Sequence, residues 1–514
     1  MRSSLLTAAS LASLFGALPV LGDNGTYWPW QTFKSEPSLQ PPVLDITKYG
    51  PTSPGYLFFD QNGNYAHNYS LFIMTDDGDL VWQGGYGDFA GFRAQVLDGE
   101  PVITFFNGVT WSEPYGWGYG LIQVLDGAYE SIYNVTVNGS DLQTLPDTDV
   151  DSSGFVSWLD LHEDRITPEG TMLTTSYNVT QANLTPVGGK EDGWLADCVF
   201  YEIDIKTDTV LFQWNALAHQ DQIPLADAEP YYPLADFGAN QSFPWGPFHI
   251  NTVDKLHDGS YLISSRHYCS LFLINPDGSV AWTLNGRTGG DFTLGSGISF
   301  CYQHDSRVRH IDGSTIDISM FNNDNNSEDY GVNQTTGLFL RLDTKEWTAT
   351  LIQELTDPSD AVYAASQGNL QVLSNGHSIM GYGSTPRIKE YYPNGTVAMS
   401  VKFGPGNNNI FSYRAYRLPW VGRPNTLPKA VACKGQTSNQ TEVYMSWNGA
   451  TEYTSWKVYS GTSEYALSFA TEVARTGFET SARLASAASY VRVEAFGLGV
   501  TLGSSEVIMV QDQC

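Results

Sequence analysis

Short apolar runs that alternate with polar residues, separated by Asp-Gly or Asn-Gly turns, recur through most of this chain. Such alternation predicts strands with one buried face, and DG or NG between two runs is the strongest short hairpin signal. One half of the recurring unit is a turn followed by a strand, as in HDGSYLISSRH from His257 and LSNGHSIMGYG from Leu373. The other half is a hairpin with an aromatic residue near its end, as in NPDGSVAWTLNG from Asn275.

These repeats predict an all-β protein. Five units, with one more shared between the two ends of the repeat region, indicate a six-bladed β-propeller over residues 23–427. The insertion at residues 217–247 is too long for a loop between strands, so we interpret it as a lid over one face. Cleaner alternation around Trp447 and Trp456 predicts a small fibronectin-III-like β-sandwich over residues 428–514.

Composition agrees with this fold class and limits the partners. The 50 Gly, 25 Pro and 13% aromatic residues are typical of a β protein rich in turns. The chain has 55 acidic against 26 basic residues, a formal charge of -29. A surface of this sign repels phosphate backbones and anionic membranes, which excludes nucleic acid as an expected partner.

The N-terminus predicts export. Residues 1–22 contain one Arg, an apolar run and then small residues, the pattern of a secretory signal peptide. No later apolar run is long enough for a membrane span. We therefore expect a glycoprotein that is secreted or kept in a lumenal or vacuolar compartment. Eleven sequons support this expectation: Asn24, Asn68, Asn134, Asn138, Asn178, Asn183, Asn240, Asn325, Asn333, Asn394 and Asn439.

The five cysteines are few for a fold that depends on disulfides. Cys433 and Cys514 bracket the last segment, which predicts a bridge that closes it. Cys269 and Cys301 could pair across neighbouring strands, which leaves Cys198 over as a buried, inert thiol. No Cys/His spacing indicates a structural metal, and we expect no cofactor.

Two histidines stand at matching places in consecutive units. His249 and His304 each come just before the strand–turn–strand pattern restarts. Radial repeats that each point one polar residue inward build a pocket on the axis, so these two are the first candidates for a site. His162 also opens a strand and could face the axis, whereas His219 and His267 have no matching partner in another unit.

Other polar residues share such positions and complete the candidate set. They are Arg266, Asp305, Arg307, Asn323 and Gln367. A metal site made of the two histidines and Asp305 is an alternative, but no carboxylate spacing supports it.

The order of these motifs resembles a known family. HIN from His249, QHDSR from Gln303 and ASQGNLQVLSNGH from Ala365 follow one another as in the fungal branch of the arylsulfotransferase (ASST-like) family, and the resemblance covers residues 50–425. It implies a six-bladed propeller with a central pocket for aromatic or phenolic small molecules. It also implies transfer of sulfate between phenols through a histidine nucleophile, and His249 and His304 match two of the pocket histidines.

The chain departs from the family pattern where the nucleophile is expected. Ser366-Gln367-Gly368 stands at that place, and Phe321-Asn322-Asn323 replaces an FDN motif. An amide keeps hydrogen-bonding capacity but supplies neither a nucleophile nor a base. This favours a repurposed pocket, and some fungal members of the family resemble cyclases of secondary metabolism.

The favoured hypothesis is therefore a hetero-Diels–Alder cyclase that joins a quinone methide to a terpene alkene in meroterpenoid biosynthesis. His249, His304, Asn323 and Gln367 would be its donors. The expected aromatic wall comprises Trp245, Phe248, Phe300, Tyr302 and Phe321. Two alternatives remain: an aryl sulfotransferase in which Arg266 or Arg307 binds the sulfuryl oxygens, and a binding module without catalysis.

Overall fold

The computed structural model describes residues 27–111, 116–137, 142–143, 145, 157–228, 234, 237–324, 334–406, 409–435 and 440–514. The expected signal peptide at residues 1–22 lies outside this part, as do residues 229–233 and 235–236 of the expected lid. The sequons outside it are Asn24, Asn138, Asn325, Asn333 and Asn439.

Regular structure in the described residues is almost entirely β-strand, as the alternating pattern predicts. Up to residue 418, six sheets of four or five strands follow one another. Three of them, in order from one edge, are β5 (Phe89–Leu97), β6 (Glu100–Thr110), β7 (Gly118–Leu125), β8 (Ser131–Val135); β9 (Asp160–Ile166), β10 (Thr171–Ala182), β11 (Gly193–Asp204), β12 (Thr209–Asn215); and β13 (Ile250–Lys255), β14 (Tyr261–Ser265), β15 (Ser270–Ile274), β16 (Val280–Asn285), β17 (Gly289–Gly290).

The other three sheets include strands from distant parts of the chain. They are β19 (His304–Asp312), β20 (Thr315–Asn322), β21 (Thr336–Asp343), β22 (Thr348–Leu355), β18 (Thr293–Leu294); β23 (Asn369–Val372), β24 (Ser378–Gly381), β25 (Arg387–Tyr391), β26 (Val397–Lys402), β1 (Asp45–Lys48); and β27 (Ala415–Leu418), β2 (Tyr56–Gln61), β3 (Ser70–Met74), β4 (Leu80–Tyr86). The last sheet thus joins both ends of the repeat region, as expected. Three short 3-10 helices lie at Thr185–Val187, Ala216–His219 and Leu225–Asp227.

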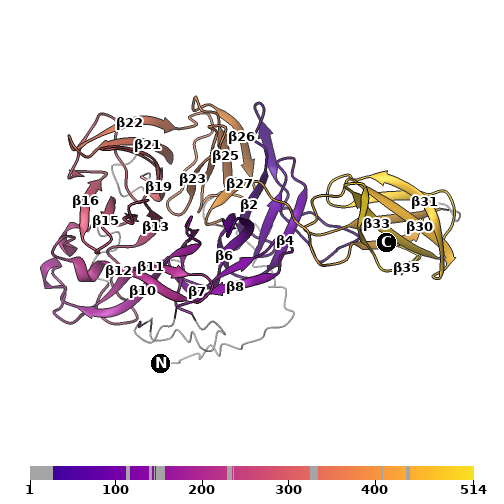
Figure 1. The fold of residues 1–514 in the computed structure, drawn as a ribbon, viewed down its shortest axis with the longest axis horizontal. Coiled ribbons are helices and arrows are strands. Elements are labelled where there is room, and N and C mark those ends of the chain that lie inside the picture. Colours follow the sequence, from indigo (N-terminus) through magenta and orange to yellow (C-terminus); the bar gives the residue numbers. More distant parts are fainter. Residues whose placement is uncertain are drawn as a thin grey trace.

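The first strands of the six sheets form a closed ring. Contacts run from β5 to β9, β13, β19 and β23 in turn, and β27 contacts both β24 and β5. Figure 1 shows the sheets arranged around this ring, with β13, β19 and β23 near its centre. We call these six the inner strands. Because they run side by side, residues at the same place in successive inner strands come together although they are far apart in the sequence.

The turn signals sit where the repeats predict them. HDGS links β13 to β14 and SNGH links β23 to β24, with Gly259 at φ 86° and Gly376 at φ 84°. Only glycine adopts this left-handed conformation without strain, which explains the residue type in these turns. The first half of the repeat is therefore the hairpin between the inner strand of a sheet and the strand that follows it.

Residues after 428 form a separate pair of sheets. One sheet contains β28 (Lys429–Lys434), β29 (Thr441–Ser446) and β32 (Thr480–Leu484), and the other contains β31 (Ala466–Ala474), β30 (Ser455–Ser463), β33 (Tyr490–Gly497), β34 (Val500–Ser504) and β35 (Ile508–Met509). Trp447 and Trp456 are buried between them, as expected. This body, yellow in Figure 1, meets the ring body near β4. There Asn448 exchanges two hydrogen bonds with the backbone of Gln83, at 2.9 and 3.0 Å.

Both expected cysteine pairs are bonded, Cys269 to Cys301 and Cys433 to Cys514. Cys198 is free and buried, and burial raises the pKa of its thiol, which keeps it protonated. Within the described parts of the chain, no helix has both the length and the apolar content to cross a bilayer.

Candidate active site

Histidines gather where the inner strands begin. His162 is the third residue of β9, His249 immediately precedes β13 and His304 is the first residue of β19. All three side chains are buried, with at most 6% of their surface exposed. His267, from the loop after β14, joins them, with its ring centroid 5.1 Å from that of His249. We call these four side chains the histidine cluster.

Asp160, His162 and His249 form a hydrogen-bonded chain. The carboxylate of Asp160 lies 2.5 Å from Nδ1 of His162, and Nε2 of His162 lies 3.1 Å from Nε2 of His249. A carboxylate accepts a proton from Nδ1–H, so Nε2 of His162 is the acceptor and Nε2–H of His249 the donor. This assignment leaves the lone pair of His249 on Nδ1, which has no hydrogen-bond partner among the described residues.

The carboxylate that begins this chain is itself fixed. Asp160 also accepts hydrogen bonds from the backbone N–H of Gly118 at 2.9 Å and the hydroxyl of Thr175 at 2.9 Å. Tyr413 packs edge-on against His162, with ring centroids 5.6 Å apart. The tautomer and orientation of His162 are therefore determined by its surroundings.

An arginine supplies positive charge beside the cluster. Arg266 donates from Nη1 to Nε2 of His267 at 2.8 Å, and Nδ1 of His267 donates to the carbonyl of Gly246 at 2.8 Å. The guanidinium also lies 4.8 Å from the ring centre of Tyr302. Both ring nitrogens of His267 are thus in use, and this histidine positions Arg266.

His304 is tied to the two amides that the sequence singled out. Its Nδ1 donates to the side-chain carbonyl of Asn323 at 2.8 Å, and its Nε2 accepts from the backbone N–H of Gln367 at 3.2 Å. The amide of Asn323 donates to the carbonyl of Gln367 at 3.1 Å. His304 is therefore a fixed neutral imidazole with no lone pair left for attack.

Burial and neighbouring positive charge keep His249, His267 and His304 neutral. Desolvation lowers the pKa of His249 and of His304 well below 6.5, and His162 and Arg266 lower it further. The pKa of His267 falls to about 3, again chiefly through desolvation and then through Arg266. At neutral pH these imidazoles therefore carry lone pairs and no charge.

The backbone is strained at the same place. His249, Tyr302, Asp305 and Gln367 all have φ between 51° and 65°, although none is glycine. Such conformations persist only where surrounding structure imposes them, and they concentrate at functional sites. All four stand at or just before the start of an inner strand.

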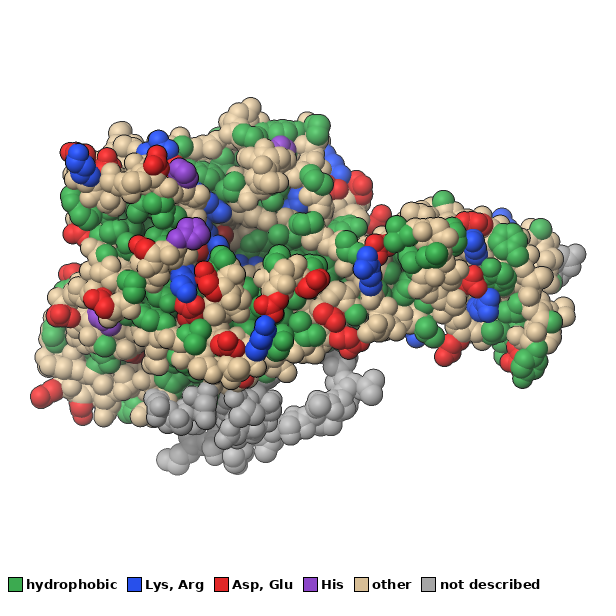
Figure 2. Space-filling model, viewed as in Figure 1, with side chains coloured by type: hydrophobic (Ala, Val, Ile, Leu, Met, Phe, Trp, Pro, Cys, Tyr) green, Lys and Arg blue, Asp and Glu red, His purple; other side chains and the backbone are tan. Residues whose placement is uncertain are grey.

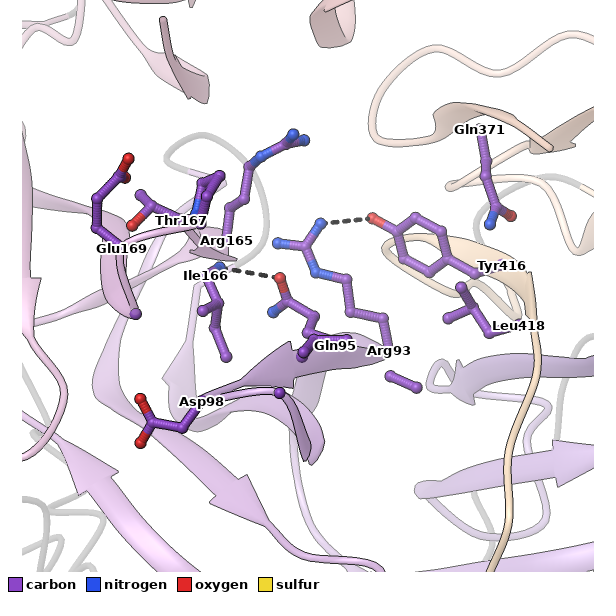
Figure 3. Close-up of a pocket in the computed structure, with 15 residues that line it drawn as sticks. Arg93, Gln95, Asp98, Arg165, Ile166, Thr167, Glu169, Gln371, Tyr416 and Leu418 are labelled. Atoms are coloured by element: carbon purple, nitrogen blue, oxygen red, sulfur yellow. Dashed lines mark hydrogen bonds between the residues drawn. The ribbon is translucent and has the colours of Figure 1, made fainter. Parts of the chain in front are cut away.

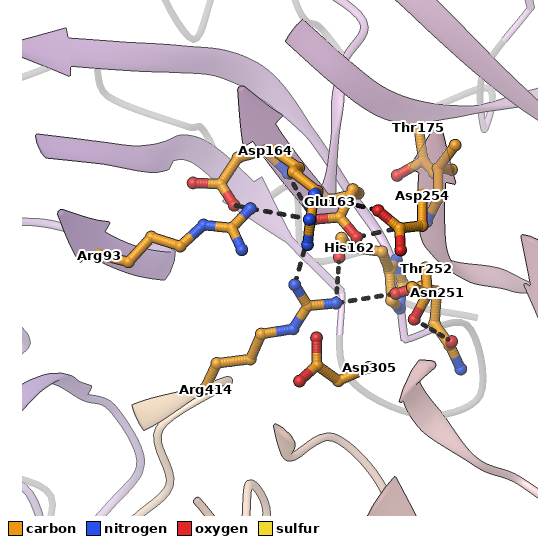
Figure 4. A network of polar contacts seen from close by, with 12 residues as sticks. Arg93, His162, Glu163, Asp164, Thr175, Asn251, Thr252, Asp254, Asp305 and Arg414 are labelled. Carbon is orange, nitrogen blue, oxygen red and sulfur yellow. Dashed lines mark hydrogen bonds and ion pairs between the residues drawn. The ribbon is translucent and has the colours of Figure 1, made fainter. Parts of the chain in front are cut away.

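Asp305 and Arg307 belong to an ion-pair network one layer further along the inner strands (Figure 4). The carboxylate of Glu163 is its hub and lies 2.7 Å from Arg307, 2.9 Å from Arg93 and 3.2 Å from Arg414. These charges lower the pKa of Glu163 below its usual range. Arg414 also donates to the backbone carbonyl of His162 at 2.9 Å, so the network helps to fix the backbone that carries this histidine.

Four of the five expected wall aromatics pack elsewhere. Phe248 lies among Trp214, Tyr268 and Phe272 of the adjoining sheets, since a residue next to His249 points the opposite way. Trp245, Phe300 and Phe321 are likewise buried in apolar cores. Only Tyr302 reaches the cluster, through Arg266. Tyr177 and Tyr413 lie against the histidines instead, with ring centroids 5.9 Å from that of His249 and 5.6 Å from that of His162.

Sequence reasoning missed Asp160 and did not select His162 or His267. His162 obeys the same rule as His249 and His304, because it too stands at the start of an inner strand. The signal for Asp160 was its i, i+2 spacing from His162. No pattern marks His267, which enters through a loop.

Among the described residues, no group of three or more His, Cys, Asp or Glu side chains is arranged to hold a metal ion. The sequons in this part of the chain are all at least partly exposed, and their modification stays a prediction. They are Asn68, Asn134, Asn178, Asn183, Asn240 and Asn394.

Comparison with known proteins adds one informative match. The family model for arylsulfotransferase (ASST) matches residues 93–404, which contain all the histidines of the cluster. No curated protein matches the sequence.

Solved structures show only weak likeness. A protein of unknown function from Bacteroides caccae is 13% identical, covering 71% of this chain and 98% of its own, with a TM-score of 0.38. An α-L-arabinofuranosidase from Fusarium graminearum is 10% identical, covering 70% of this chain and 88% of its own, with a TM-score of 0.31. Likenesses at this level support no conclusion about activity.

Proposed function

We propose that this chain, which belongs to the arylsulfotransferase (ASST) family, transfers a sulfuryl group from an aryl sulfate to a phenol with His249 as the nucleophile. The observation that carries the proposal is the Asp160–His162–His249 chain, which leaves the lone pair of His249 on Nδ1. A buried carboxylate and an intervening imidazole are the partners that activate a nucleophile of this kind. Gln367 therefore need not replace a lost nucleophile, because the chain provides one elsewhere.

In the first step, Nδ1 of His249 attacks the sulfur of the aryl sulfate. The N–S bond forms as the bond between sulfur and the phenolic oxygen breaks, and the phenolate leaves. Attack makes the imidazole acidic, and its Nε2 proton passes to Nε2 of His162 over 3.1 Å. The resulting imidazolium is stabilised by Asp160, which holds the opposite ring nitrogen.

In the second step, the oxygen of an acceptor phenol attacks the sulfur of sulfo-His249. The N–S bond breaks and the aryl sulfate product forms. The proton on Nε2 of His162 returns to Nε2 of His249, and the phenolic proton goes to the departing donor phenolate or to solvent. Every group is restored, so the cycle needs no oxidant, reductant or metal ion.

The neighbours of the nucleophile have supporting roles. Arg266 provides positive charge for the sulfuryl oxygens and is held by His267 at 2.8 Å. His304, Asn323 and Gln367 form a neutral wall whose hydrogen bonds fix the backbone where Gln367 adopts φ 65°. Tyr302, Tyr177 and Tyr413 supply flat aromatic surface suited to a phenol.

The same proposal includes the architecture and the route of the protein. The six sheets around one ring are interpreted as the blades of a six-bladed propeller, and the sheets after residue 428 as a fibronectin-III-like sandwich. Residues 217–247 would cover one face as a lid. Two disulfides and accessible sequons support a route through the secretory pathway.

A cyclase is the second candidate, and one observation favours it. His249, His267 and His304 are all neutral and all lie beside Arg266, so Arg266 is a fixed cationic donor in otherwise uncharged surroundings, which suits a carbonyl acceptor. A hetero-Diels–Alder addition of a quinone methide to a terpene alkene in meroterpenoid biosynthesis needs such a donor and no nucleophile. The packing of Phe248, Phe300 and Phe321 away from the cluster makes this the less supported reading.

The deciding experiment offers the purified glycoprotein 4-nitrophenyl sulfate and a phenol, and follows the sulfated phenol by mass spectrometry. We expect turnover by the wild type and by the His257→Ala control, whose histidine lies in an exposed turn of the same sheet. His249→Ala should abolish turnover, and quenched wild type should carry a sulfo group on His249. Turnover that survives in His249→Ala would refute this nucleophile.

A parallel reaction offers a generated quinone methide and a terpene alkene, scored by chiral chromatography against the uncatalysed background. A single enantiomer without sulfate transfer would replace the sulfotransferase by the cyclase. If neither reaction gives a product, a binding module without catalysis remains as the function.

A further inference from the structure

A cavity lies at the opposite end of the inner strands from the histidine cluster. It has a volume of about 670 Å³ and is lined by residues from β5, β9, β23 and β27, among them Arg93, Arg165, Gln371 and Tyr416. Figure 3 shows the guanidinium of Arg165 extending into the space that Arg93 and Tyr416 border. On the face drawn in Figure 2, the ring body is hollowed near its centre and Lys or Arg side chains are visible inside.

We propose that this cavity is a binding site for a small multivalent oxyanion, held by Arg165 with Arg93 beside it, while Arg309 adds positive charge from outside the lining. The proposal is independent of the sulfotransferase chemistry, because none of these side chains belongs to the histidine cluster. It rests on three observations: the free donors of Arg165, the balance of charge around the cavity, and the exposure of cations that strands surround.

Arg165 has donors to offer. Its Nε lies 3.2 Å from a carboxylate oxygen of Asp254, and in the described residues its two Nη groups have no hydrogen-bond partner. The side chain keeps 39% of its surface exposed, although it rises from an inner strand, because it faces the cavity. Two parallel N–H groups on a planar guanidinium match two oxygens of one oxyanion.

Arg309 adds a second cation without a carboxylate of its own. It donates to the hydroxyl of Ser319 at 2.6 Å and to the carbonyl of Leu370 at 2.8 Å, and its side chain is exposed. No ion pair to it is present among the described residues. Desolvation lowers its pKa to about 10, with Arg307 and Arg165 acting in the same direction and Asp305 against them. Arg309 therefore stands near other guanidinium groups and makes no ion pair with a described carboxylate.

The charges of the whole cluster do not balance. Five guanidinium groups, of Arg93, Arg165, Arg307, Arg309 and Arg414, face four carboxylates, of Glu163, Asp164, Asp254 and Asp305. The protein as a whole carries -29, so an excess of positive charge at its axis is opposite to its general character. Two further carboxylates line the rim, Asp98 at 2.6 Å from Lys206 and Glu169 at 4.0 Å from Lys255, so the excess is confined to the guanidinium layer beneath them.

These features select the ligand. The excess charge favours an anion, and the fork of Arg165 favours one with at least two oxygens in a plane. The cavity is large enough for sulfate, phosphate or a short dicarboxylate, and it is too small to enclose a polymer. Inorganic sulfate and malonate share this chemistry but represent an inorganic and an organic source, so both serve as probes.

The test is calorimetric titration of the full-length protein with sodium sulfate and with sodium malonate, each against sodium chloride at equal ionic strength. We expect saturable binding of at least one dianion and weakening of at least about tenfold in Arg165→Gln. Arg341→Gln is the matched control, because Arg341 is 54% exposed and paired with Asp317 outside the cavity. Equal affinities in Arg165→Gln and wild type would overturn the proposal, as would no binding of either dianion.

A measurement on the wild type guards against a folding defect in the variant. An arginine-selective dicarbonyl reagent should modify Arg165 in the absence of sulfate, with the site read by mass spectrometry. If sulfate or malonate binds there, modification of Arg165 slows while that of Arg341 does not change. Unchanged labelling of Arg165 at saturating dianion would contradict the assignment.

Discussion

The two ends of the inner strands both bury polar side chains, histidines at one end and arginines at the other, but they offset the cost of burial in different ways. At one end three histidines of the cluster are neutral, because desolvation lowers the pKa of His249, His267 and His304. At the other end guanidinium groups cannot lose their protons, so Glu163 and other carboxylates must compensate them. A buried imidazole can lose its charge and then offers a lone pair for chemistry. A buried guanidinium keeps its charge, so it serves to hold carboxylates or to bind an anion.

The largest difference between the two ends should be in stability, when Glu163, the carboxylate shared by three arginines, is replaced. Glu163→Gln would leave Arg93, Arg307 and Arg414 without their shared partner. We expect a loss of about 3–5 kcal/mol in the free energy of unfolding, because single removal strands buried charges. Denaturant unfolding measures it. Glu169→Gln, at a side chain that is 58% exposed, should change stability by less than about 0.5 kcal/mol.

The next largest effect is on turnover at the neutral end. Asp160→Asn keeps the shape of the side chain but removes the charge that stabilises protonated His162. We expect kcat for sulfuryl transfer to fall about 100-fold. Steady-state kinetics with Asp258→Asn as the control variant provides the check, since Asp258 lies in an exposed turn. A rise in KM with unchanged kcat would instead assign Asp160 to substrate binding.

A smaller effect appears in the pH dependence of stability. His267 has a folded-state pKa of about 3, below its unfolded value of 6.5, so below pH 6.5 the unfolded state binds more protons. This histidine therefore destabilises the protein as pH falls, by about 1.4 kcal/mol per unit. His267→Gln should lose about 1.4 kcal/mol less than wild type between about pH 7.5 and pH 5.5. Parallel pH profiles of unfolding would contradict this.

The smallest effect concerns an arginine–carboxylate pair that lies outside the inner strands. Arg341 contacts Asp317 at 2.7 Å but is 54% exposed, so solvent screens the pair. Arg341→Gln should cost at most about 1 kcal/mol. Added salt should reduce that cost further, whereas it should barely change the effect of Glu163→Gln. A larger loss for Arg341→Gln than for Glu163→Gln would reverse the comparison.

The sequence predicted the repeat and two of the histidines, because both follow from regular spacing. Which side chains face the ring did not follow, since strand alternation breaks at the site itself. Pairing between β13 and β14 shifts register between Ile250 and Thr252, and pairing between β19 and β20 shifts between His304 and Arg307. A β-bulge re-aims the side chains beside it, so alternation counted from either end gives the wrong face.

The charged layer was also beyond reach from the sequence. Glu163 pairs with Arg93, Arg307 and Arg414, which lie up to 251 positions away in the chain. Short-range spacing cannot identify such partners. His267 was missed for another reason: it enters the cluster from a loop after β14, where no strand pattern applies, and Arg266 and Gly246 hold it in place.

The closure of the ring also constrains how the protein is made. β1 pairs with β26, and β27 pairs with β2, so strands from the two ends of the repeat region complete each other's sheets. A nascent chain that has not yet emerged to Leu418 has unpaired edges on β2 and cannot assemble the layer that holds His162, since Arg414 is missing from it. Activity thus depends on nearly complete translation of the ring body, and a chain released early would expose adhesive strand edges instead of a partly working site.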